Sequence, residues 1–169
     1  FEYWAYSFIF IKDKVSPKDI PFKLNRAQRR VLNKLEKLRK AGKPIKFILL
    51  KARQWGGSTL VQIYMLWIML VHRRNWNTVI CGDVETQSDF GELHQARNVR
   101  AMITKALNKY PSYLLGETVK FTPFEGSSKN KVIQNTNCVV SIGSFQKPDT
   151  LRSGDISGAH LTEIGLWRA

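Results

Sequence analysis

The chain has 169 residues, a formal net charge of +14 and two cysteines. This length is typical of one domain that buries a core without disulfides, which argues against a small disulfide-rich fold. The basic excess favours a polyanionic partner. Nucleic acid is the first candidate, although ribosomal, membrane-surface and assembly proteins also carry basic surfaces. Because Cys81 and Cys138 lie in apolar runs, we expect buried free thiols rather than a disulfide or a metal site.

The first 44 residues predict an N-terminal arm followed by a helix. Residues Tyr3–Ile11 are aromatic and apolar and suit either a strand or a helix, and the segment Lys12–Pro21, with its two prolines, predicts a loop. Over Phe22–Lys40, apolar residues recur at spacings of three and four, which predicts a helix. Asn25 is the expected N-cap, and the helix should end within Ala41–Pro44.

The predicted helix is strongly basic. Glu36 is the only acidic residue that opposes a run of lysines and arginines. Such a run is commonly a solvated helix face, and it also suits contact with nucleic acid. The basic residues are Lys23, Arg26, Arg29, Arg30, Lys34, Lys37, Arg39, Lys40 and Lys43.

The next segment has the pattern strand, loop, helix. The apolar run Ile45–Leu50 predicts a strand, the segment Lys51–Thr59 combines a glycine pair with two hydroxyls, and Ser58–His72 predicts a helix. In a P-loop, glycines let backbone N–H groups face a phosphate, and the helix directs its positive dipole end at the same anion. The helix contains Gln62 and is too short to span a membrane. A strand–turn–helix with an incidental Gly-Gly is the alternative interpretation.

The usual pattern G-x-x-x-x-G-K-[ST] is only partly met. Gly56 takes the second glycine position and Ser58 the hydroxyl position. Gly57 stands where the lysine is expected, and Lys51 stands where the first glycine is expected. A cation is needed near the terminal phosphates, and the long Lys51 side chain can supply it from the entry of the loop. Arg53 can add a second positive charge.

Alternating elements continue to residue 142. We predict a strand at Thr78–Gly82, a helix at Thr86–Lys109, and short strands at Val119–Phe121, Lys131–Gln134 and Val139–Ile142, the last two with hairpin spacing. The sequence therefore predicts an α/β fold of the P-loop NTPase type. Its central sheet should be mostly parallel and flanked by helices, with some antiparallel strands late in the chain.

A second candidate motif lies at Gly158–Trp167. An apolar strand ending in Thr162-Glu163 has the form of a Walker B motif, and we expect it beside the strand at 45–50, with its carboxyl end at the phosphate crevice. Thr162 replaces the usual Asp and can contact Mg²⁺ without adding charge. Glu163 is the candidate base that activates water. A surface Glu after a short strand is the alternative.

Gln28 is a third candidate, placed on the basic helix. A glutamine amide both donates and accepts hydrogen bonds, so it can read the edge of an adenine. Glutamines on helices are commonly solvated, which is the alternative.

Together these segments resemble the N-terminal ATPase domain of the large terminase subunit of tailed bacteriophages and prophages. Some members of that family carry a deviant loop with its lysine at the start, as in Lys51–Thr59, and a small hydroxyl residue before the Glu, as in His160–Trp167. The segments Ile11–Lys14 and Phe22–Arg30 are also similar, so the resemblance covers nearly the whole chain.

The resemblance implies an ATP hydrolase that uses ATP and Mg²⁺. It implies that Ser58 and Thr162 contact the metal and that Glu163 activates water. Arg53 would stabilise charge on the transferring phosphoryl group, and Arg152 is a candidate arginine finger, with a salt-bridged or solvated Arg152 as the alternative. The implied nucleotide-binding residues are Gln28, Lys51, Arg53, Gln54, Trp55, Gly56, Gly57, Ser58 and Thr59.

The resemblance also implies a genome-packaging motor that moves double-stranded DNA into a procapsid. The expected partners are DNA, the portal protein and the small terminase subunit, with a homo-oligomeric ring on the portal in the cytoplasm of a bacterial host. Residues 1–44 would form the arm and the adenine-motif helix, and residues 45–169 the ATPase core, ending after the Walker B motif. The family's nuclease domain is not among these residues, so we expect no DNA cleavage.

Two other functions remain open. A superfamily 2-type helicase or translocase shares the Gln, loop and acid arrangement, although Gly57 in the lysine position and the absence of an Asp-Glu-x-His box argue against it. A nucleic-acid-binding assembly module with a degenerate, non-hydrolysing nucleotide site would also explain Gly57 and Thr162.

Overall fold

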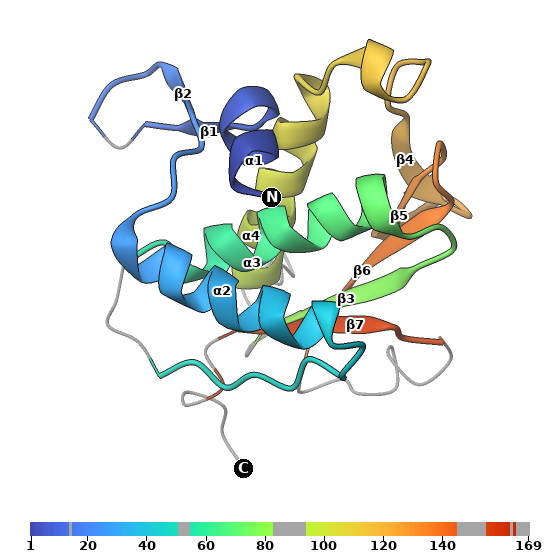
Figure 1. The fold of residues 1–169 in the computed structure, drawn as a ribbon. Coiled ribbons are helices and arrows are strands. Elements are labelled where there is room, and N and C mark those ends of the chain that lie inside the picture. Colours follow the sequence, from blue (N-terminus) through green and yellow to red (C-terminus); the bar gives the residue numbers. More distant parts are fainter. Residues whose placement is uncertain (14, 51–54, 83–93, 145–154, 163, 165–169) are drawn as a thin grey trace.

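The computed structural model describes residues 1–13, 15–50, 55–82, 94–144, 155–162 and 164 (Figure 1). The described part begins with a short helix and a two-stranded hairpin, continues with helices and a strand, and ends with the strands of a larger sheet. The helices are α1 (Glu2–Phe8), α2 (Arg26–Lys40), α3 (Gly57–Trp67) and α4 (His94–Asn108), with a π-helical turn at Ile68–His72 and a 3₁₀ turn at Ser112–Leu114. The strands are β1 (Phe10–Lys12), β2 (Asp19–Pro21), β3 (Asn77–Gly82), β4 (Phe121–Phe124), β5 (Ser127–Ile133), β6 (Cys138–Ser144) and β7 (Gly158–Leu161).

The larger sheet has five strands in the order β4-β5-β6-β3-β7. β3 runs parallel to both β6 and β7, whereas β5 runs antiparallel to β4 and to β6. The predicted α/β class and the late antiparallel strands are therefore confirmed. The sheet is mixed rather than mostly parallel in the described residues, because the chain crosses over only twice and otherwise returns through tight turns.

Most predicted strands are present. β3 covers the predicted Thr78–Gly82, and β5 and β6 form the predicted hairpin. The strand predicted at Val119–Phe121 instead runs from Phe121 to Phe124 and includes Pro123. β4 lies at the end of the sheet, where a proline removes no hydrogen bond that a central strand would need.

The strand predicted at Ile45–Leu50 is wrong. These residues have no regular secondary structure, and Ile48 and Leu50 are 94% and 100% exposed. A strand is held by ladder hydrogen bonds to a neighbour, and no strand in the described ranges pairs with this segment. Its apolar, β-prone composition is therefore not enough to make it a strand.

The predicted neighbour of β7 is wrong for the same reason. β7 pairs with β3, with Thr78 opposite Gly158 and Cys81 opposite Leu161. The two strands are parallel, so their carboxyl ends meet at one edge of the sheet.

α2 is confirmed as a helix, and Asn25 is its N-cap. The Asn25 side chain accepts a hydrogen bond from the backbone N–H of Gln28, and the Gln28 side chain accepts one from the backbone N–H of Asn25, which makes a capping box. The cap explains why α2 begins at Arg26, although Phe22 and Leu24 just before it are also buried.

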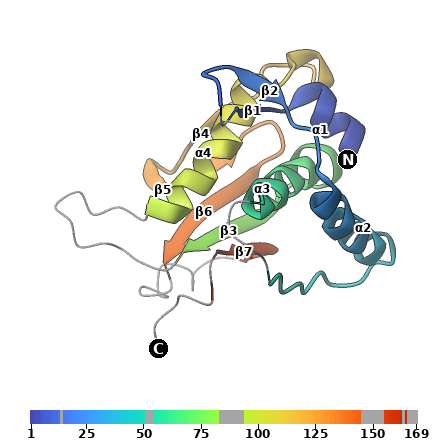
Figure 2. The ribbon, with the colours of Figure 1, turned by 90° about the vertical axis from the view of Figure 1, so that its left-hand side faces the viewer.

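α3 is apolar on nearly every side. Leu60, Ile63 and Leu66 are fully buried, and the helix packs against α4 and β7. In Figure 2, α3 lies between α4 and α2. None of the helices in the described part of the chain has the length and hydropathy that a bilayer crossing requires.

The N-terminal arm belongs to the same hydrophobic core as the sheet. Ala5 and Ile9 are fully buried in a cluster that also contains Ile80 and Ile142. The Phe1 ring makes edge contacts with the rings of two α3 residues, Tyr64 and Trp67. The arm thus covers one side of α3. Cys81 and Cys138 are buried free thiols, as predicted.

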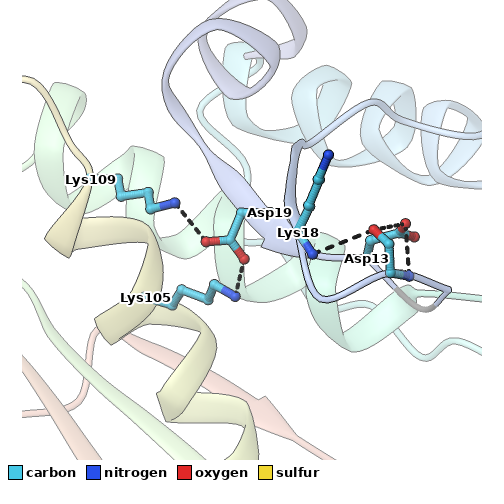
Figure 3. Close-up of polar contacts among 6 residues, drawn as sticks. Asp13, Lys18, Asp19, Lys105 and Lys109 are labelled. Atoms are coloured by element: carbon cyan, nitrogen blue, oxygen red, sulfur yellow. Dashed lines mark hydrogen bonds and ion pairs between the residues drawn. The ribbon is translucent and has the colours of Figure 1, made fainter.

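The β1–β2 hairpin is held to α4 by an acidic side chain. The carboxylate of Asp19 on β2 forms ion pairs with Lys105 and with Lys109 (Figure 3). The ammonium of Lys109 also lies 5.5 Å from the centre of the Phe10 ring on β1. Hydrogen bonding to the two lysines holds the pKa of Asp19 below its usual range.

A polar network joins α2 to α3. The guanidinium of Arg39 donates to both carboxylate oxygens of Glu36 at 2.7 and 2.8 Å, and the Tyr64 hydroxyl donates to Glu36 at 2.6 Å. Arg39 also lies 5.1 Å from the centre of the Trp67 ring. The hydrogen bond from Arg39 lowers the pKa of Glu36, while burial raises the pKa of Tyr64.

We expect Glu36→Gln to lower the free energy of unfolding at pH 7 by ~1–2 kcal/mol, because it removes charge-assisted hydrogen bonds at a largely buried carboxylate. The pKa of Glu36 is lowered in the folded state, so its contribution is complete above the ordinary glutamate pKa and is lost as pH falls through the lowered value. The difference in unfolding free energy between Glu36→Gln and wild type should therefore become smaller as pH falls. Urea denaturation measured from pH 7 down to acidic pH tests this prediction, with exposed Glu117→Gln as control. A difference in unfolding free energy that stays constant with pH would contradict it.

Candidate functional site

The turn before α3 requires glycine. Gly56 has φ 85° and ψ 23°, in the left-handed region, and a Cβ built there would lie 2.7 Å from Nε2 of Gln28. The first helical hydrogen bond of α3 runs from the Leu60 N–H to the Gly56 carbonyl at 3.1 Å. The turn therefore places the N-terminus of a buried helix, with its positive dipole end, directly after Gly56.

The capping box of α2 also holds this turn. Nδ2 of Asn25 donates to the Trp55 carbonyl at 3.1 Å, and Nε2 of Gln28 donates to the Gly56 carbonyl at 2.9 Å. In a trans peptide the N–H points opposite to the C=O. Both carbonyls face α2, so the N–H groups of Gly56 and Gly57 face away from it. Two side chains from α2 thus orient the backbone donors of the loop.

The structure assigns Gln28 a position that sequence reasoning missed. Its side chain is 4% exposed, its Oε1 accepts from the Asn25 N–H, and its Nε2 bonds to the Gly56 carbonyl. The adenine contact stays a prediction. To make it, the amide would use its second N–H and its second lone pair.

The Trp55 ring packs against the second glycine of the pair. A Cβ on Gly57 would lie 2.7 Å from Cζ2 of Trp55. A side chain at position 57 would therefore displace the Trp55 ring. The indole Nε1 is buried and has no hydrogen-bond partner among the residues that the structure describes.

The two hydroxyls of the loop differ in their surroundings. The Thr59 hydroxyl donates to the sulfur of Met102 on α4 at 3.4 Å, so it faces the neighbouring helix. Ser58 is half-buried, and its hydroxyl makes no hydrogen bond to another described residue. Of the two, Ser58 is the one whose hydroxyl is available to a ligand, and its role toward Mg²⁺ stays a prediction.

The residue after β7 is tied to the end of β3. The Thr162 N–H donates to the Cys81 carbonyl at 2.8 Å, and the Thr162 hydroxyl donates to the same oxygen at 3.3 Å. Thr162 is 5% exposed. The hydroxyl proton is therefore directed at the sheet, and the role of Thr162 toward Mg²⁺ stays a prediction.

A part-buried polar pair links α3 to β7. Nε2 of Gln62, a fully buried residue, lies 2.6 Å from Nδ1 of His160. Because the amide donates, the histidine nitrogen accepts. Oε1 of Gln62 is buried with no partner among the described residues. Sequence reasoning missed this pair, since nothing local relates two residues 98 positions apart.

The two candidate motifs therefore lie on packed elements. The loop precedes α3, Thr162 follows β7, and the Gln62–His160 contact joins the two. Among the described side chains, no group of three or more His, Cys, Asp or Glu suits a metal ion. The remaining predicted site residues lie outside the described residues: Lys51, Arg53, Gln54, Arg152 and Glu163.

Neither a scan against protein-family models nor a search of curated proteins finds a match for this chain. An assignment of function therefore depends on the motifs and on the geometry around them.

We expect Gly56→Ala to destabilise the protein more than Gly42→Ala. Both glycines have positive φ, at +85° and +64°, so either alanine carries the left-handed penalty of about 1–2 kcal/mol. Nothing lies within 4 Å of a Cβ at Gly42, whereas at Gly56 the methyl displaces the Gln28 amide from its carbonyl. Gly56→Ala should therefore lower the free energy of unfolding by about 1 kcal/mol more than Gly42→Ala does, which is the contribution of one hydrogen bond.

Chemical denaturation of both variants measures this excess destabilisation. When Gly56→Ala and Gly42→Ala are compared in a Gln28→Ala background, most of the excess should disappear. Equal losses in the two single variants would show that Gln28 does not restrain the turn.

We expect His160→Ala to lower the free energy of unfolding by about 1–3 kcal/mol, because Nε2 of Gln62 then stays buried without an acceptor. Gln62→Leu in that background should recover part of the loss, since it removes the orphaned amide. A double-mutant cycle on urea unfolding isolates the pair from the other contacts of His160. Additive effects would mean that the two side chains do not interact.

Proposed function

We propose that this chain is the ATPase domain of a viral DNA-packaging motor, which hydrolyses ATP to move double-stranded DNA into a procapsid. The observation that carries the proposal is the Gln62–His160 contact. It brings the helix after the glycine turn beside the strand that leads to Thr162 and Glu163. A phosphate-binding loop and an acidic residue on the adjoining strand are the two parts that ATP hydrolysis needs.

The loop offers donors suited to phosphate. The N–H groups of Gly57, Ser58 and Thr59 lie in the first turn of α3, where no intrahelical acceptor exists for them. Lys51 and Arg53 supply the positive charge that the position of Gly57 lacks.

The donor set also fits Mg²⁺. Serine and threonine hydroxyls are hard oxygen ligands, and Mg²⁺ commonly keeps several waters while it bridges phosphate oxygens. Ser58 would contact the ion, and Thr162 would do so directly or through water. The ion would neutralise charge on the phosphates, and Glu163 would orient and deprotonate the attacking water. Arg152 or Arg53 would stabilise charge in the transition state.

Two alternatives differ from this proposal in what they would do with DNA. A helicase or translocase of the superfamily 2 type would use the same loop, and separation of a tailed duplex would favour it. An assembly module with a degenerate site would bind DNA and show no turnover. DNA-stimulated hydrolysis would eliminate that module.

Steady-state ATP hydrolysis, with and without double-stranded DNA, tests the proposal. We expect Glu163→Gln to lower kcat at least ~100-fold while ATP binding persists, since it removes the base and not the phosphate contacts. Lys51→Ala should instead weaken ATP binding.

The matched controls are Glu117→Gln and Lys18→Ala, two exposed residues distant in sequence from Lys51 and Glu163, which should leave turnover unchanged. Turnover that survives in Glu163→Gln would refute the role of Glu163. If wild type binds ATP and does not turn over, the assay is repeated with portal and procapsid, because a finger supplied by a neighbouring subunit would otherwise be missing.

A further inference from the structure

α2 has two chemically different sides. Val31, Leu32 and Leu35 are buried against the core. Arg26, Arg30, Lys34 and Lys37 are all exposed, and at 100° per residue they fall within an arc of roughly 80° on the opposite side. We call these four residues the basic face of α2.

Contacts within the described part of the protein do not explain the basic face. In the described part of the chain, none of its four residues forms an ion pair, whereas the neighbouring Arg29 and Arg39 pair with Glu2 and Glu36. Like charges three and four residues apart on a helix repel and destabilise it. A helix that keeps such a row without a compensating acid is suited to a polyanion outside the protein.

The dimensions of the face suit a nucleic-acid backbone. From Arg26 to Lys37 the helix rises about 16 Å, which matches roughly five phosphates along one strand of a duplex. Near the N-terminal end of α2, a pocket of about 370 Å³ is lined by Tyr3, Tyr6, Lys23, Leu24 and the Arg29–Glu2 ion pair. Tyrosine hydroxyls and basic side chains are both common phosphate contacts.

α2 also reaches the glycine turn. The same helix that carries the basic face holds the Trp55 and Gly56 carbonyls through Asn25 and Gln28 at its N-terminus. A duplex bound along the basic face would therefore contact α2, the helix that orients the loop's N–H groups.

We propose that the basic face of α2 is a binding surface for the phosphate backbone of double-stranded DNA. This inference rests on the proposed function for the role of the DNA, because a packaging ATPase must bind the DNA that it moves and couple that binding to its nucleotide site. The binding itself is independent of hydrolysis.

The test compares two triple variants of equal net charge. Arg30→Gln/Lys34→Gln/Lys37→Gln neutralises the basic face, and Arg73→Gln/Arg74→Gln/Lys120→Gln neutralises three exposed basic residues elsewhere. Glutamine keeps helix propensity close to that of Arg and Lys, and circular dichroism verifies the fold. Binding of a duplex of random sequence is measured as a function of salt.

We expect the α2 variant to flatten the slope of log Kobs against log[salt] by about 2.7, which is 0.9 for each of three lost phosphate contacts. The control variant should change the slope by less than half as much. Equal slopes for the α2 variant and wild type, or equal losses in the two variants, would overturn the inference. Binding of single strands in preference to the duplex would also overturn it.

The two proposals fail in different ways. If wild type hydrolyses no ATP in any assay and the α2 variant still loses its salt slope, the DNA surface stands and the ATPase proposal falls. If the ATPase is active and its stimulation by DNA is unaffected in the α2 variant, with unchanged slope, the surface falls and the ATPase proposal stands.

Discussion

The burial of α3 on nearly every side is the constraint on which the rest of the structure depends. A helix without a polar face is stable only when other elements surround it, since each exposed Leu or Ile side chain would forgo about 1.5–3 kcal/mol. α4, β7, α2 and the ring of Phe1 supply that cover. Two polar side chains beyond the first turn of α3, Gln62 and Tyr64, each bond to a different neighbour, so they fix its rotation and its position along its axis.

Local signals in the sequence predicted most elements correctly. The apolar spacing of α2, its Asn25 cap and the apolar run of β3 act over a few residues, and the structure contains all of them near their predicted bounds. The glycine pair at 56 and 57 also predicted a turn that starts a helix, because only glycine adopts φ 85° there without strain. These features depend on the backbone and its nearest neighbours, which is why a single sequence suffices.

What the sequence could not reveal is pairing over long distances. The segment at 45–50 has the more strand-like composition, yet in the described residues it is β7 that pairs, because a strand needs a ladder of bonds to a neighbour. Gln28 was predicted as an adenine contact from its residue type, and the structure gives it carbonyl and N–H partners of its own. Such contacts are decided by which elements pack together, and no spacing rule encodes them.

The exposed segment Ile45–Leu50 has a consequence for how the protein behaves in solution. It is apolar and β-prone, and the carbons of Leu50 lie wholly in water, so two copies would gain by joining these segments edge to edge. Lys46 interrupts the run, and the net charge of +14 keeps molecules apart through a repulsion that reaches about one Debye length. Added salt shortens that length from about 30 Å at 0.01 M to about 3 Å at 1 M. Colloidal stability therefore decreases as ionic strength rises, and a bound polyanion that neutralises the surface acts in the same direction as salt.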